Sequence, residues 1–160
     1  MRKLYVYLAG VCTVLALAGC SPQPQPQPQP QQFSGGDPKL FTQAGLKEGG
    51  VIKANGQPGF LVYGPYVALE PGVYRLLAKG NLAGPNQSLG TIDITADKGK
   101  SILATKPIVA DQGATESIAS LDFEVVKPVA DAEFRINVAA QTTGSFTGYE
   151  LTKIAKLGEK

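Results

Sequence analysis

The sequence predicts an all-β protein whose main domain is an antiparallel β-sandwich of about eight strands. Three observations lead to this prediction. From residue 51 onward, apolar and polar residues alternate along short segments, which is typical of strands that bury one face. Turns rich in Gly, Pro and Asn separate these segments. No long stretch keeps the 3.6-residue period of an amphipathic helix.

The predicted strands follow one another with short turns between them. Alternation is clearest in 91–97, where Ile92 and Ile94 are expected to face the core, and in 132–140, where Phe134 and Ile136 are. The full set of predicted strands is 51–54, 60–69, 73–80, 91–97, 102–109, 118–126, 132–140 and 146–157.

Two of these strands contain a proline, which cannot donate a hydrogen bond to a neighbouring strand. Gly64-Pro65 therefore predicts a bulge or an edge break, and Pro107 weakens the strand around it. Before the strands, residues 33–46 give a mixed signal. Its apolar residues, which we expect to pack across one end of the sandwich, are Phe33, Leu40, Phe41 and Leu46.

The first 20 residues have the composition of an export signal. Arg2 and Lys3 are followed by residues 4–18, which carry no charge and are mostly apolar. This stretch is shorter than a membrane-spanning helix requires. It ends in Leu17-Ala18-Gly19-Cys20, which resembles the lipobox of bacterial lipoproteins. The resemblance implies cleavage before Cys20, a diacylglycerol thioether on its sulfur and an acylated amino group. An ordinary secretory signal or a short anchor helix is the alternative.

The sequence thus predicts a signal peptide at 1–19, a lipidated Cys20 with a Pro/Gln linker at 20–32, and the β-sandwich at 33–160. Proline alternating with Gln favours extended polyproline II, so the linker is expected to act as a spacer. A recognition motif for another domain is the alternative. We expect an extracytoplasmic protein held in the membrane by lipid. The resemblance implies that Ser21, in place of Asp, permits an outer-membrane location where the organism has one.

Composition argues against several classes of function. The chain has no His, which removes Ser/His and Cys/His catalysis and most zinc sites. Its only cysteines are Cys12, in the predicted signal peptide, and Cys20. Asp122 and Glu124 share a strand face, but nothing marks them as a catalytic pair. We therefore expect no enzyme activity, no cofactor and no metal, since the acidic residues also lack cation-loop spacing.

Charge argues against nucleic-acid binding. Without Arg2 and Lys3 the chain has 13 basic and 13 acidic residues, and no basic patch is present. Attachment to a membrane is therefore expected to come from lipid on Cys20 rather than from charge.

A second distinctive stretch begins at Gly59 and reads GFLVYGPYVALEPGVYRL. It resembles the YGPY…L-x-P-G-x-Y signature of carbohydrate-binding-module-like domains with the galactose-binding-like jelly roll. The matching residues are Tyr63, Gly64, Pro65, Tyr66, Leu69, Pro71, Gly72 and Tyr74. The resemblance covers most of 50–155 and implies a jelly roll that binds glycans or serves in assembly. The chain has no Trp for stacking on sugar rings, so Tyr would take that role.

Four side chains are candidates for ligand binding. Tyr63 and Tyr66 flank Gly64-Pro65, so we expect at least one to point out of the core; a fold-defining aromatic is the alternative. Arg75 and Arg135 lie on the polar faces of different strands, and Arg can grip the carboxylate of an acidic sugar with two hydrogen bonds. The alternative is a solvated face where neighbouring acidic residues balance them, namely Asp93, Asp122, Glu124 and Glu133.

Two functions follow from these observations. The first is a non-catalytic, lipid-anchored module that binds an envelope glycan. The second is a structural or assembly lipoprotein that docks on an envelope protein partner. Docking would require an exposed apolar patch, for which the outward candidates are Leu77, Val126 and Leu157.

Overall fold

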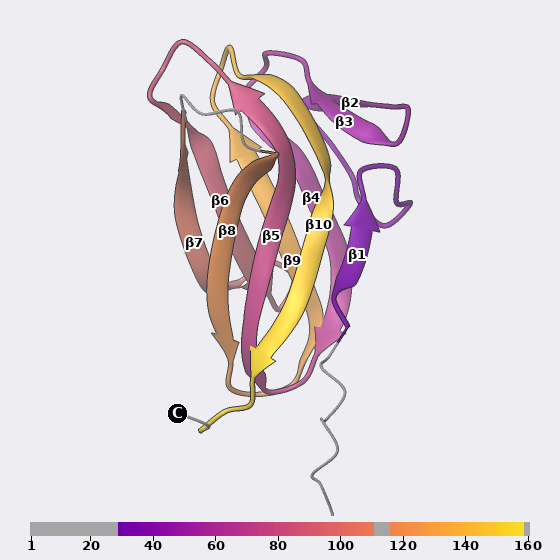
Figure 1. Ribbon diagram of the computed structural model, residues 1–160, viewed down its shortest axis with the longest axis vertical. Helices are drawn as coiled ribbons and strands as arrows, with labels where there is room; N and C mark the ends of the chain where they lie inside the picture. Colours follow the sequence, from indigo (N-terminus) through magenta and orange to yellow (C-terminus); the bar gives the residue numbers. More distant parts are fainter. Residues whose placement is uncertain (1–28, 111–115, 159–160) are drawn as a thin grey trace, which may run out of the picture.

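A computed structural model describes residues 29–110 and 116–158. These residues form ten β-strands in two antiparallel sheets that pack face to face (Figure 1). The prediction of an antiparallel β-sandwich is confirmed, with ten strands rather than about eight. Within the described residues, no helix is long and apolar enough to cross a membrane. The predicted signal peptide and Cys20 lie outside the described residues.

One layer is a six-stranded sheet in which β10 is paired on both sides. Its strands are β1 (Gln31–Ser34), β2 (Gly45–Glu48), β3 (Val51–Ala54), β5 (Gly72–Ala83), β8 (Ser117–Val125) and β10 (Thr143–Ala155). Their order is β2-β3-β10-β5-β8, and β1 pairs with β10 beside β3.

The other layer is a four-stranded sheet in the order β4-β9-β6-β7. Its strands are β4 (Gly59–Leu69), β6 (Ser88–Ala96), β7 (Ser101–Val109) and β9 (Val129–Val138).

The two strands that the sequence did not predict, β1 and β2, carry almost no alternation. Each has four residues; in β1 only Phe33 is buried, and in β2 no residue is. A strand that buries one side chain or none leaves no period-2 signal in the sequence. Strand β1 begins at Gln31, so the last two residues of the predicted linker, 20–32, belong to the sheet.

Both proline-containing strands lie at edges of the four-stranded sheet. Among the described strands, β4 pairs only with β9, apart from a single bridge between Tyr63 and Phe41, and β7 pairs only with β6. An edge strand tolerates proline because one side of its backbone has no ladder partner. The register of β4 slips between Pro65 and Val67, as the predicted bulge requires, whereas β7 continues through Pro107.

The core lies between the sheets and is centred on aromatic rings. The fully buried ring of Phe134, on β9, packs edge-on against Phe33 at 6.3 Å and against Tyr149 at 5.6 Å between ring centroids. Phe33 and Leu40 of the lead-in are buried as expected. Phe41 and Leu46 are exposed, so the prediction that they pack into the sandwich was wrong.

Phe134→Ala is expected to lower the free energy of unfolding by about 3–5 kcal/mol, because it leaves a cavity between the sheets. Ile102→Ala is the matched control, since the side chain of Ile102 is 64% exposed; its effect should stay within about 0.5 kcal/mol. Urea unfolding followed by circular dichroism measures both. Equal losses for the two variants would contradict this description of the core.

Candidate functional site

The outer face of the four-stranded sheet gathers most of the predicted binding residues. Alternation along β9 directs Phe134 inward and its neighbours Glu133 and Arg135 outward. Strand pairing then places Tyr63 of β4 and Asp93 of β6 on either side of Arg135. One row across the sheet therefore reads Tyr63, Arg135, Asp93.

An aromatic cluster forms the β4 edge of this face. Phe41 makes an isolated bridge to Tyr63, and their rings stack at 5.5 Å between centroids. The ring of Phe60 lies 6.0 Å from that of Tyr63. Gly64 permits the close approach, because a Cβ there would lie 2.2 Å from the carbonyl oxygen of Lys39. Phe41 is 46% exposed, so the cluster presents aromatic surface to solvent.

Tyr66 lies on the same face, at the register slip of β4. It follows a cis Gly64–Pro65 peptide bond and has a left-handed φ of 59°. Its ring is 44% exposed, which agrees with the expectation that one of the two tyrosines points outward. The Tyr66 hydroxyl donates a hydrogen bond to Oε1 of Glu133 at 2.8 Å. Burial, and then this hydrogen bond, raise the pKa of Tyr66 to about 12.

Glu133 is held in place from two sides. Its second oxygen, Oε2, accepts a hydrogen bond from the Thr95 hydroxyl at 3.3 Å. The residue is only 8% exposed, and it forms no ion pair with another described residue. The face thus contains a fixed negative charge beside the ring of Tyr66.

Arg135 and Asp93 form a two-pronged ion pair in the middle of the face. Arg135 Nε donates to Asp93 Oδ1 at 2.7 Å, and Nη2 donates to Oδ2 at 2.8 Å. The side chains are 18% and 17% exposed, and the hydrogen bond to Asp93 raises the pKa of Arg135. The guanidinium also lies 5.4 Å from the centroid of the Phe60 ring. The fork predicted to grip an acidic sugar is therefore occupied by Asp93.

Arg75 does not join this group. It lies on β5, in the six-stranded sheet, and donates two hydrogen bonds of 2.7 Å to Asp122. That hydrogen bonding lowers the pKa of Asp122. The structure thus brings together Tyr63, Tyr66 and Arg135 and leaves Arg75 on the other sheet.

Sequence reasoning missed the contribution of Phe41 and assigned Asp93 and Glu133 only to charge balance. The outward direction of both acidic residues follows from alternation, but which strands are neighbours does not. Phe41 lies in the lead-in, where no periodic pattern exists. Among residues 29–110 and 116–158, no group of three or more His, Cys, Asp or Glu side chains is arranged to hold a metal ion.

The fold resembles carbohydrate-binding modules of known structure. The C-terminal CBM6 module of LamC, a marine laminarinase from Zobellia galactanivorans, superposes with a TM-score of 0.55 at 12% identity. That match covers 78% of this chain and all of the module. A family 35 carbohydrate-binding module from Clostridium thermocellum superposes with a TM-score of 0.51 at 14% identity. That match covers 77% of this chain and 97% of the module.

These matches establish a shared jelly-roll fold, which confirms the fold implied by the YGPY-containing stretch. No protein-family model matches the chain, and no curated protein does.

The free energy of unfolding should fall in strongly alkaline solution, because the hydroxyl of Tyr66 loses its proton there. Its pKa is raised from 10 to about 12, so its contribution is complete below pH 10 and lost as the pH rises through 12. The Tyr66→Phe variant lacks the hydroxyl. The difference in urea midpoint between wild type and this variant, the gap, should therefore shrink between pH 8 and pH 11.5. A gap that stays constant would contradict the raised pKa of Tyr66. Other tyrosines affect both proteins alike.

Proposed function

We propose that the protein is a lipid-anchored lipoprotein of the cell envelope whose β-sandwich binds a glycan without catalysing a reaction. The observation that carries the proposal is the outer face of the four-stranded sheet. There the partly exposed ring of Tyr66 lies beside Glu133. The partly exposed ring of Phe41 stacks on Tyr63, which is paired across the strands with Arg135, and Arg135 is held by Asp93. The fold shared with carbohydrate-binding modules supports it.

This combination suits a sugar for a physical reason. A pyranose ring offers an apolar C–H face, which packs on an aromatic ring, and hydroxyls at its edge, which need hydrogen-bonding partners. The carboxylates of Glu133 and Asp93 are acceptors for those hydroxyls, and the remaining N–H groups of Arg135 are donors. Because neighbours already hold these polar groups, binding orders few side chains, which lowers its entropic cost.

The charges on the face favour a neutral glycan. Asp93 occupies the guanidinium fork of Arg135, so a sugar carboxylate finds no free two-pronged partner there. Glu133 adds a negative charge close to Tyr66. An acidic sugar on this face would be repelled, whereas a neutral one would meet acceptors and donors alike.

A binding role suits the carboxylates better than a catalytic one. Glycoside hydrolysis needs one protonated carboxyl and one free carboxylate across the scissile bond. Glu133 accepts two hydrogen bonds, from Tyr66 and Thr95, and Asp93 is engaged with Arg135. Each carboxyl group is already engaged by these neighbours, so neither is placed to donate a proton to a glycosidic oxygen.

The lipid anchor rests on Leu17-Ala18-Gly19-Cys20, and the strand register supports its geometry. Strand β1 is antiparallel to β10, with Gln31 opposite Leu151, so the chain enters the sandwich from the end where β10 finishes (Figure 1). The proposed binding face runs along the side of the sandwich rather than across that end. A lipid on Cys20 would therefore leave it open to the surroundings.

The alternative, docking on an envelope protein, has less support. Val126 is 69% exposed, but Leu77 and Leu157 are partly buried. Leu77 is flanked along β5 by Arg75 and Lys79, each in an ion pair. The three candidate residues therefore do not present the broad apolar patch that docking requires.

Tyr66→Ala is expected to weaken glycan binding about tenfold, because it removes both an aromatic contact and a hydroxyl that positions Glu133. Residues 20–160 carrying Cys20→Ser would be titrated by calorimetry against neutral and acidic envelope polysaccharides and peptidoglycan. Arg75→Ala is the matched control and should bind like the wild type. Binding lost equally in both variants, or no saturable binding to any glycan, would count against the proposed site.

Cys20→Ala should move the protein from the membrane fraction to the soluble extracytoplasmic fraction. The domain should stay folded, because the strands of the described residues all lie between Gln31 and Ala155. Fractionation followed by detection of the protein measures the change, with Cys12→Ala as the control. A Cys20→Ala protein that still sediments with membranes would contradict the lipobox assignment.

A further inference from the structure

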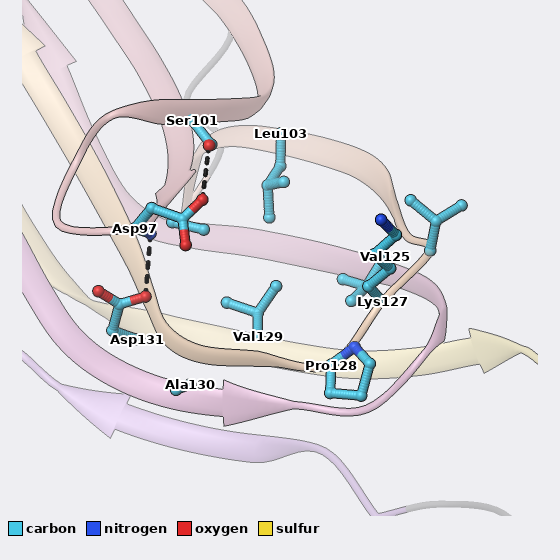
Figure 2. A pocket seen from close by; sticks show the side chains of 11 residues that line it. Asp97, Ser101, Leu103, Val125, Lys127, Pro128, Val129, Ala130 and Asp131 are labelled. Carbon is cyan, nitrogen blue, oxygen red and sulfur yellow. Dashed lines mark hydrogen bonds between the residues drawn. The ribbon is translucent and has the colours of Figure 1, made fainter.

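A separate cavity of about 380 Å³ lies at one end of the sandwich, between the β6–β7 turn and the β8–β9 turn (Figure 2). Its size is within the range of small-molecule sites, roughly 300–1,000 Å³. The cavity is not lined by the side chains of the proposed glycan site on the outer face, namely Tyr63, Tyr66, Glu133 and Arg135. It is therefore a distinct place for a ligand.

The middle of the cavity is aliphatic. Leu103 of β7, Val125 of β8 and Val129 of β9 converge there from three strands. No aromatic side chain lines it. A surface of this kind favours contact with an aliphatic group and lacks the ring on which a sugar would stack.

Two carboxylates form one side. Asp131 accepts hydrogen bonds from the backbone N–H groups of Asp97 and Lys98, at 3.0 and 2.8 Å. These two residues have left-handed φ angles of 54° and 57°, so Asp131 holds the turn in shape. Asp97 Oδ2 accepts from the Ser101 hydroxyl at 2.7 Å, whereas Oδ1 accepts no hydrogen bond from the described residues. A fixed carboxylate thus keeps a free acceptor at the cavity.

A cation lies on the other side. Figure 2 shows Lys127 and Pro128 across the cavity from Asp97 and Asp131, with Leu103 and Val129 between them. Lys127 forms no ion pair with the described residues. The cavity therefore has a negative side, an aliphatic middle and a positive side.

We propose that this cavity binds a short aliphatic peptide with free termini. Its ammonium group donates to Asp97 Oδ1 in the field of Asp131, its aliphatic side chain packs on Leu103 and Val129, and its carboxylate faces Lys127. The separation of opposite charges by an apolar floor selects a zwitterion over a neutral or singly charged ligand. The cavity shares no lining side chain with Tyr63, Tyr66, Glu133 and Arg135 of the outer face, so either proposal can fail without the other.

The test uses residues 20–160 with Cys20→Ser and the tripeptide alanyl-leucyl-alanine as the probe. Titration followed by heteronuclear NMR should show saturable shifts at the methyl groups of Leu103, Val125 and Val129. Acetylating the amino group of the probe should weaken binding at least tenfold, because it removes the charge that Asp97 recognises. That comparison requires no protein variant, so it does not depend on the stability of a mutant.

Asp97→Asn should also weaken binding at least tenfold while keeping the turn, since Asn tolerates left-handed φ and still accepts from Ser101. Lys98→Gln is the matched control, because Lys98 lies on the same turn but does not line the cavity. It should bind the tripeptide like the wild type. Shifts absent from the cavity at millimolar tripeptide, or equal affinity for the acetylated probe, would overturn the proposal.

Discussion

The packing of Phe134 between the two sheets underlies both the fold and the candidate site. Its ring contacts Phe33 of β1 and Tyr149 of β10, and so joins the four-stranded sheet to the six-stranded one. The residues on either side of it in β9 are Glu133 and Arg135. Because successive side chains point to opposite faces, burial of Phe134 inward holds these two outward. Tight packing of Phe134 in the core therefore restricts the motion of Glu133 and Arg135 on the outer face.

Polar groups on that face satisfy one another before any ligand arrives. Asp93 neutralises Arg135, and Tyr66 and Thr95 hold Glu133. A partly buried charge without a partner would be costly, so these pairings stabilise the face as well as shaping it. They also limit what it can recognise, because the guanidinium is no longer free for a carboxylate. The same pairing occurs between Arg75 and Asp122 on the other sheet, but there the neighbouring rings of Tyr74 and Phe123 are buried in the core.

The two proposed sites lie on different parts of the sandwich and rest on different chemistry. The outer face combines aromatic rings with fixed polar groups, which suits a sugar. The end cavity combines aliphatic side chains with separated opposite charges, which suits a zwitterion. Both depend on a turn or bulge that departs from regular strand geometry: the slip of β4 at Tyr66 and the left-handed turn at Asp97 and Lys98. In each case the irregular backbone directs a polar side chain away from the core.

The sequence by itself predicted the all-β sandwich, the direction of most strand residues and the break at Gly64-Pro65, because alternation and proline act locally. It also assigned Tyr63, Tyr66 and Arg135 to a site. It missed β1 and β2, whose side chains are almost all exposed, and it grouped Arg75 with residues on the other sheet. Only the tertiary structure decided which strands are neighbours, and hence that Phe41 lies beside Tyr63, Asp93 beside Arg135 and Glu133 beside Tyr66. Strand order depends on long-range packing between segments far apart in the chain, which no local pattern encodes.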